Sequence, residues 1–178
     1  MRQLCTSAKV RGPSEPLVED GAGSHKCGRN CHTCAVVEET RQFQSKNTGR
    51  TYTVRKNINC KTKWVVYLLC CQKCGGQYVG KSKNGFGKRH SGHKQDIKNG
   101  VAGVGVHFKK CGYEHLRAIL IDRVDSEGQE EDFCARQLKN KEVFWQHQLR
   151  VFEENGGNAF CIKDETKTTT IFGQNRGV

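Results

Sequence analysis

The stretch 64–93 constrains the fold of this chain more than any other, because it joins two strand-like segments to a basic one. Its first part, Trp64–Leu69, is continuously apolar, which predicts a central strand covered on both faces. Tyr67 lies in that strand, and a second short strand carries Tyr78, with Gly80 two residues later. A lone tyrosine in such a strand is ordinarily a core residue whose hydroxyl has a partner. It is the pair of tyrosines that indicates a functional site.

A basic segment follows the second tyrosine, with six lysines and arginines between residues 81 and 98 against one acid. The Asn84-Gly85 turn leads into a predicted helix that ends near Asn99-Gly100. In that helix Arg89 and His93 are four residues apart and share a face. The lysines are read as a solvated helix surface. Tyrosine, arginine and histidine together in a basic setting predict a site that handles a phosphodiester.

The overall charge favours a polyanionic partner. The 178 residues carry 30 Lys and Arg against 18 Asp and Glu, a formal net charge of +12. Such an excess is typical of proteins that bind nucleic acid, and the alternative is a well-solvated basic protein. No segment approaches the roughly 18 apolar residues of a spanning helix, and the N-terminus lacks the apolar core of a signal peptide. We therefore expect an intracellular protein without a membrane partner.

Eleven cysteines without a secretion signal favour thiolate ligands of zinc over a disulfide scaffold. Three are closely spaced and a fourth follows about 26 residues later, a pattern that suits a tetrahedral zinc site in a small loop-rich unit: Cys27, Cys31, Cys34 and Cys60. A histidine, His25 or His32, is an alternative fourth ligand. The other interpretation is a flexible arm with free thiols.

A second pair, Cys71-x2-Cys74, lies between the two tyrosine strands. The βαβ context of a redox-active Cys-x-x-Cys is missing, so a zinc half-site is the better interpretation. His107 and His115 downstream are the predicted partners, and Cys70 and Cys111 are rival ligands. Such a zinc ion would stiffen the site without taking part in its chemistry.

The flanking segments predict four regions. Residues 1–24 read as a disordered lead-in, 25–62 as the cysteine-rich unit, 63–161 as the main domain and 162–178 as a loose tail. Within the cysteine-rich unit, Thr40–Gln44 and Thr51–Arg55 form a predicted hairpin. Leu116–Val124 predicts a third strand in the main domain, and a short helix is expected through His107–Lys110.

A long helix is predicted from about Glu127 to Phe152, with Ser126-x-x-Gln129 as its capping box. Its apolar stripe includes Leu138 and Trp145, and Glu142 lies between them. A carboxylate inside an apolar stripe must be neutral, paired or bound to a metal ion, because burying it bare is costly. The structural alternative to a metal site is a salt bridge from Glu142 to Arg89 or Lys139.

Taken together, residues 64–160 resemble the GIY-YIG nuclease domain. The first motif is present in degenerate form as Val65-Val66-Tyr67 and the second as Tyr78-Val79-Gly80. The other positions that match in order are Arg89, His93, Glu142 and Asn158. Within that family the chain is most similar to the endonuclease of Penelope-like retroelements, which carry two cysteines between the motifs and two histidines downstream. Both residues before Tyr67 are valine, a mild departure from the motif.

The resemblance implies an α+β fold, a small three-stranded, mostly antiparallel sheet flanked by helices, with the N-terminal zinc-binding unit packed on it. It implies hydrolysis of DNA phosphodiesters with Glu142 holding Mg²⁺ or Mn²⁺, Tyr67 as general base and structural Zn²⁺ nearby. Tyr78, His93 and Asn158 would complete the catalytic set, and phosphate contacts would come from Lys81, Lys88 and Arg89. Expected partners are DNA and a reverse transcriptase or its RNA, in the nucleus. The alternative function is a non-catalytic zinc-bearing module that binds nucleic acid.

Overall fold

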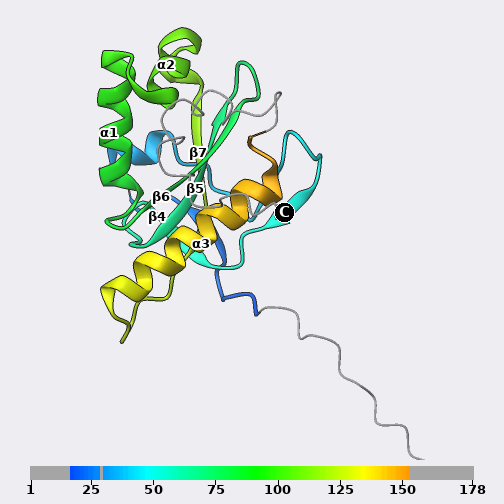
Figure 1. The fold of residues 1–178 in the computed structure, drawn as a ribbon, viewed down its shortest axis with the longest axis vertical. Helices are drawn as coiled ribbons and strands as arrows, with labels where there is room; N and C mark the ends of the chain where they lie inside the picture. Colours follow the sequence, from blue (N-terminus) through cyan, green and yellow to red (C-terminus); the bar gives the residue numbers. More distant parts are fainter. Residues whose placement is uncertain (1–16, 29, 153–178) are drawn as a thin grey trace, which may run out of the picture.

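The computed structural model describes residues 17–28 and 30–152, and Figure 1 shows their arrangement. In chain order the elements are β1 (Gly23–His25), the 3-10 turn η1 (His32–Ala35), β2 (Gln42–Gln44), β3 (Thr51–Thr53), β4 (Asn57–Asn59), β5 (Val65–Cys71), β6 (Gln77–Ser82), α1 (Phe86–Asn99), α2 (Ala102–Cys111), η2 (Tyr113–His115), β7 (Leu116–Arg123) and α3 (Glu131–Leu149). Among the described residues, no helix is both long and apolar enough to cross a membrane.

The central feature is an antiparallel three-stranded sheet in the order β6-β5-β7. β5 is the apolar segment predicted as the central strand, and Val65 to Leu69 are all buried. Tyr67 lies opposite Gly80 of β6 on one side and Leu120 of β7 on the other. The predicted fold class, a small antiparallel sheet flanked by helices, is confirmed.

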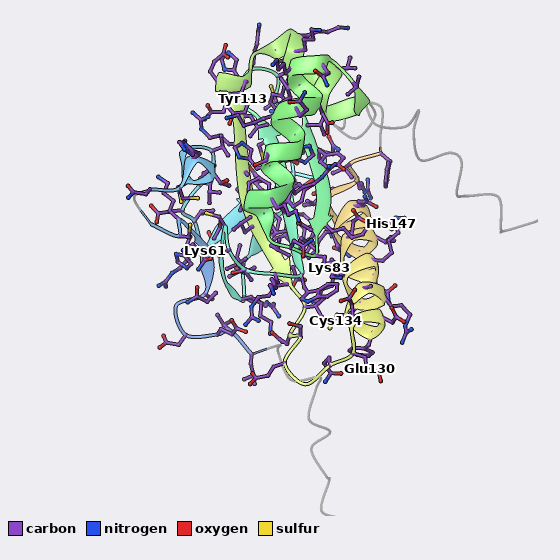
Figure 2. The ribbon with its side chains drawn as sticks, turned by 90° about the vertical axis from the view of Figure 1, so that its left-hand side faces the viewer. Lys61, Lys83, Tyr113, Glu130, Cys134 and His147 are labelled. Carbon is purple, nitrogen blue, oxygen red and sulfur yellow. The ribbon has the colours of Figure 1, made fainter. Side chains whose placement is uncertain are left out.

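The two long helices contact opposite faces of this sheet. Side chains alternate along a strand, so Tyr67 and Gly80 belong to one face while Val66 and Lys81 belong to the other. The Tyr67 ring packs against Phe86 of α1, whereas Lys81 contacts α3. Figure 2 shows α3 running along the sheet from Glu130 to His147.

The N-terminal residues form two further pairs of strands and complete the molecule. β1 and β4 are parallel, and β2 and β3 form the predicted antiparallel hairpin. Val37 forms a bridge with Ala118 of β7, so this segment covers the edge of β7, which would otherwise expose unpaired backbone groups. Residues on both sides of position 62 share one hydrophobic core. The predicted lead-in ends at residue 24, but β1 already begins at Gly23, because pairing with β4 orders it.

The helix boundaries differ from the predictions at both ends of α3 and in the length of α2. α3 ends at Leu149 and not at Phe152, because Arg150 adopts a left-handed conformation as its C-cap. α3 begins at Glu131 and not near Glu127, so the predicted capping box is wrong. Gly128 has φ +67 and the Gln129 amide bonds the Ser126 carbonyl, which makes this segment a turn. α2 begins at Ala102 and reaches Cys111, which is longer than predicted. α1 ends at Asn99 as predicted, with Gly100 as its left-handed cap.

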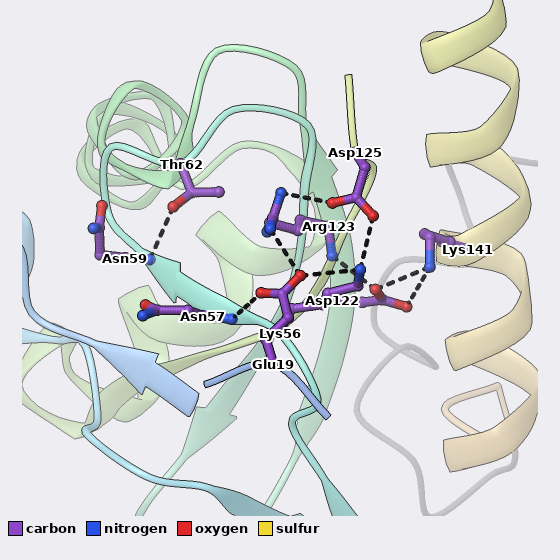
Figure 3. A network of polar contacts seen from close by, with 9 residues as sticks. All are labelled: Glu19, Lys56, Asn57, Asn59, Thr62, Asp122, Arg123, Asp125 and Lys141. Carbon is purple, nitrogen blue, oxygen red and sulfur yellow. Dashed lines mark hydrogen bonds and ion pairs between the residues drawn. The ribbon is translucent and has the colours of Figure 1, made fainter. Parts of the chain in front are cut away.

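A network of charged side chains joins the N-terminal segment to the end of β7 (Figure 3). Glu19 pairs with both Lys56 and Arg123, and Asp122 accepts two hydrogen bonds from Lys141 of α3. Burial alone would raise the pKa of Glu19, but hydrogen bonds from the Asn57 amide, Lys56 and Arg123 bring it down to about 2. The network therefore holds Glu19 as a carboxylate at neutral pH and ties the segment around Glu19 to the sheet.

Candidate active site and cysteine clusters

The Tyr67 hydroxyl is the centre of a cluster that contains four of the predicted site residues. Its oxygen lies 2.9 Å from His93 Nε2 and 3.4 Å from Arg89 Nε. The Tyr78 ring lies 6.5 Å from that of Tyr67 and 6.2 Å from that of His93, measured between centroids. The structure thus brings Tyr67, Tyr78, Arg89 and His93 together on the α1 face of the sheet.

Gly80 has a steric role in this cluster. A Cβ at position 80 would lie 2.5 Å from the Tyr67 hydroxyl oxygen and 2.8 Å from a ring carbon of Tyr78. Such distances are far inside van der Waals contact, so the phenol of Tyr67 passes over β6 only because the opposing residue has no side chain. The glycine of the second motif is explained by this close approach.

The electrostatics of the cluster favour a neutral imidazole beside a cation. Burial, the nearby Arg89 charge and His90 lower the pKa of His93 to about 3, so His93 is neutral at pH 7. Burial alone would lower the pKa of Arg89, but the Tyr67 hydroxyl outweighs it and the net pKa is raised. The Nδ1 atom of His93 is buried and has no hydrogen-bond partner among the residues that the structure describes, and it lies 3.9 Å from Asp96 Oδ2.

Glu142 is buried in α3, 5% exposed, and approaches β6 from the other face of the sheet. The ammonium groups of Lys81 and Lys139 both contact its Oε2 atom, the second at 3.3 Å. The pairing with Lys139 is one that the sequence suggested, whereas Lys81 takes the place suggested for Arg89. Both lysines use one oxygen, and within residues 17–28 and 30–152 the second oxygen of Glu142 has no hydrogen bond.

The edge strand β6 joins the two halves of the site. Gly80 supports the Tyr67 cluster on one face, and the next residue, Lys81, contacts Glu142 on the other. Lys88 is an exposed residue in the first turn of α1. Asn158 lies outside the described residues, so its predicted place in the site remains a prediction.

The four N-terminal cysteines meet as predicted. The sulfur atoms of Cys27, Cys31, Cys34 and Cys60 all lie within 4.8 Å of one another. The Cys34 sulfur is 3.7 Å from that of Cys27 and 3.3 Å from that of Cys60. A tetrahedral zinc with Zn–S bonds of about 2.3 Å has sulfur atoms roughly 3.8 Å apart, so this donor set fits zinc.

The acidity of these thiols differs from one residue to the next. Burial alone would raise the pKa of Cys31, but hydrogen bonds from Cys27 and from the backbone amides of Cys34 and Thr33 lower it to about 7. Burial raises the pKa of Cys60, as do the thiols of Cys34 and Cys27. The Cys27 backbone amide donates a hydrogen bond of 3.2 Å to the Cys34 sulfur.

The second cluster differs from the prediction in one ligand. Cys71, Cys74 and His107 come together as predicted, but the fourth member is Cys111 and not His115. The Cys74 sulfur lies 3.5 Å from His107 Nε2. His107 and Cys111 are four residues apart on α2 and share a face, whereas His115 follows the Gly112 cap and approaches Glu114. The second cluster therefore offers three cysteines and one histidine, which are also a zinc donor set.

Sequence reasoning missed several residues that support the site. The buried His90 and Thr33 contact each other, and His90 also contacts Tyr113. The helical spacing of His90 and His93 in α1 was the available signal. A cavity of about 970 Å³ lies elsewhere, between the β2–β3 hairpin, β7 and α3. None of the predicted catalytic residues within the described part of the chain lines it.

No protein-family model matches the sequence, and no curated protein matches it. Among solved structures, the fold is similar to that of the catalytic domain of the homing endonuclease I-TevI. The match has a TM-score of 0.41 and 22% sequence identity, and it covers 52% of this chain and 92% of that chain. A similarity of this extent determines neither the family nor the activity of the chain.

Proposed function

We propose that this chain is a metal-dependent DNA endonuclease of the GIY-YIG type. The observation that supports it most is the convergence of Tyr67, Tyr78, Arg89 and His93 around one phenol oxygen. A buried glutamate of α3, Glu142, contacts Lys81 of the adjoining strand β6. The net charge of +12 suits a polyanionic substrate. These are the groups that the resemblance assigns to phosphodiester hydrolysis.

Glu142 is the residue that would hold the divalent cation. In its buried carboxylate one oxygen is paired by two lysines, and the other has no hydrogen bond from the described part of the chain. Carboxylate oxygens are hard donors of the type that Mg²⁺ and Mn²⁺ prefer. Bound there, the cation would neutralise charge on a phosphate oxygen. Lys81 then exchanges Glu142 for a phosphate oxygen when DNA binds, which is consistent with its predicted role in substrate contact.

The proton chemistry is assigned to Tyr67 and its neighbours. A free phenol has a pKa of about 10, so a phenolate base requires a nearby cation, and Arg89 is placed 3.4 Å away. The neutral His93 forms a hydrogen bond with the phenol through Nε2 and so orients its oxygen. Tyr67 is fully buried, so Arg89, which is exposed, must move towards the phosphate before water reaches the phenol.

The cysteine clusters are proposed as structural zinc sites. The first is Cys27, Cys31, Cys34 and Cys60, and the second is Cys71, Cys74, His107 and Cys111. The second closes the turn between β5 and β6 and fixes it to α2. In this arrangement zinc stabilises the strands that carry Tyr67 and Tyr78 and takes no part in hydrolysis.

We further propose that the chain cleaves target DNA for a Penelope-like retroelement. The sequence resemblance supports this role, with a reverse transcriptase or its RNA as partner and the nucleus as location. The cysteine pair between the two tyrosine motifs is the observation specific to that group. A nick with a 3′-hydroxyl end that a reverse transcriptase extends is the product that this role requires.

A plasmid assay tests the nuclease proposal. Zinc-loaded wild-type protein and Glu142→Gln are incubated with supercoiled plasmid and Mg²⁺ or Mn²⁺, and DNA binding is measured separately by gel shift. We expect the substitution to lower the cleavage rate about 1,000-fold, since a metal ion contributes several kcal/mol to such transition states, with binding retained. Glu131→Gln, an exposed acid of the same helix paired with Lys83, is the matched control and should cleave normally.

Two outcomes would contradict this proposal in different ways. Cleavage by Glu142→Gln at the wild-type rate would remove Glu142 from the mechanism. DNA binding without cleavage by the wild-type protein, with zinc bound, would instead favour the non-catalytic binding module.

A further inference from the structure

We infer that the four-cysteine cluster holds the N-terminal half of α1 in position, and with it Arg89 and His93, through the buried positioning residue His90. The inference rests on the proposed function, because it assigns to this cluster control over the proposed active site. It is supported by two contacts between the segments of the four-cysteine cluster and α1, and a third contact joins the same imidazole of His90 to the second cluster.

The first contact seats the start of α1 on the loop that follows Cys60. The Gly87 amide donates a hydrogen bond of 3.1 Å to the Cys60 carbonyl. Gly85, the N-cap residue, has φ +87, and a Cβ there would lie 3.2 to 3.3 Å from the carbonyl oxygens of residues 60, 61 and 62. The helix end therefore rests directly on the backbone of a cysteine ligand, and its first-turn amides are partly satisfied by it.

The second contact joins α1 to the other ligand segment. Thr33 lies between Cys31 and Cys34 in η1 and is buried. Its hydroxyl is 3.3 Å from His90 Nδ1. A buried hydroxyl–imidazole bond of this kind is sensitive to small shifts of either partner, because leaving one of them unpaired costs about 1–3 kcal/mol.

The third contact links the same imidazole to the second cysteine cluster. His90 Nε2 lies 2.8 Å from the Tyr113 hydroxyl, and Tyr113 follows Cys111 by two residues. The ring of His90 also stacks on Phe86, with centroids 5.7 Å apart, and Phe86 packs on Tyr67 at 4.9 Å. One imidazole therefore connects both cysteine clusters to the ring that supports the catalytic phenol.

The consequence for the active site follows from helix geometry. His90 is adjacent to Arg89 and one turn before His93, so any tilt of this part of α1 moves both groups relative to Tyr67. A displacement of about 1 Å at a catalytic group can cost about 100-fold in rate. We therefore expect a disturbance of the contacts between the four-cysteine cluster and α1 to lower the turnover rate and to have little effect on DNA binding.

Two substitutions of His90 separate its two contacts. In His90→Asn the side-chain amide takes the place of Nδ1 and keeps the contact with Thr33, whereas in His90→Gln it takes the place of Nε2 and keeps the contact with Tyr113. Thr33→Val removes the hydroxyl at the cluster and retains the shape of the side chain. Gln95→Ala, an exposed position on the same helix, is the control.

Two readouts are measured on zinc-loaded full-length protein: kcat and KM for plasmid nicking, and hydrogen exchange of the α1 amides. We expect Thr33→Val and His90→Gln to lower kcat roughly ten- to a hundredfold with KM within about twofold, and to lose exchange protection in the first half of α1. His90→Asn should retain most of kcat and protection, and Gln95→Ala should match the wild type.

The exchange measurement keeps the inference testable if the chain is not a nuclease. Absence of cleavage by the wild type would contradict the proposed function, while loss of α1 protection in Thr33→Val and His90→Gln would still support the positioning role. Wild-type protection and turnover in both variants would overturn the inference. So would a larger loss in His90→Asn than in His90→Gln, because it would assign the positioning role to the Tyr113 contact.

Discussion

At the level of single residues, the position of the Tyr67 phenol depends on the absence of a side chain at Gly80. We expect Gly80→Ala to be strongly disruptive, because its Cβ would lie 2.5 Å from the Tyr67 hydroxyl oxygen. Relieving such an overlap typically costs about 1–3 kcal/mol of stability, and here the group displaced is the proposed base. We predict at least a tenfold loss of nicking and a lowered free energy of unfolding, measured by plasmid assay and denaturant titration.

Gly87→Ala is the matched control for that substitution. A Cβ at position 87 would meet its nearest atoms at 3.6 Å, which is ordinary contact, and alanine favours a helix over glycine by up to about 1 kcal/mol. This variant should be as stable as the wild type or more stable. Equal activity in Gly80→Ala and Gly87→Ala would show that the position of the Tyr67 phenol does not matter.

The residues of the candidate site were largely predictable, for physical reasons that can be named. Glu142 could be identified because an acid in an apolar helical stripe needs a partner, and the structure supplies Lys81 and Lys139. The contact with Lys81 could not be predicted, because it depends on the packing of α3 across β6. His90 was missed because its helical spacing to His93 does not show that Thr33 and Tyr113 are its partners.

At the level of elements, the strands were easier to predict than the helix ends. β5 and β7 carry apolar sequences that only a covered strand explains, and both appear where they were expected. The start of α3 was placed too early because Ser126 and Gln129 form a capping-box pattern, while Gly128 in a left-handed turn excludes the helix. Local patterns do not show which of two such signals prevails.

The length of α2 determines the second metal site and gives a prediction at this scale. Because α2 continues to Cys111, this cysteine shares a helical face with His107 and His115 does not. We predict that Cys111→Ala lowers the zinc content of purified protein from two ions per chain to about one, whereas His115→Ala leaves it unchanged. Zinc is measured by elemental analysis after dialysis against a weak chelator.

The same comparison also tests the alternative ligand set. If His115→Ala lost one zinc and Cys111→Ala retained both, the site would be the two-cysteine, two-histidine arrangement suggested by the sequence resemblance. Cys134→Ala, a buried cysteine outside both clusters, controls for the general effect of removing a thiol.

At the level of the whole molecule, the N-terminal residues hold both ends of the functional site. The Cys60 carbonyl accepts a hydrogen bond from the start of α1. The β2–β3 hairpin caps the C-terminal end of α3. Side chains of Ser45, Asn47 and Tyr52 donate hydrogen bonds to the carbonyls of Leu149, Arg150 and Gln148. These are carbonyls that the helix itself leaves unpaired. Residues 25–62 therefore complete the helices that carry Arg89, His93 and Glu142.

This arrangement makes the predicted boundary at residue 62 testable. A chain that begins at residue 63 would lose the Val36–Glu38 cover on β7 and the capping of α3, and it would expose core surface now buried under Val37 and Ile58. We expect such a chain to lack a cooperative thermal transition and a near-ultraviolet dichroism signal, even with zinc.

A chain that begins at residue 17 retains all of these contacts and should unfold cooperatively near the wild-type temperature. A cooperative transition at that temperature in the shorter chain would establish residues 63–161 as an independent domain and would leave the N-terminal unit a role other than support of the site.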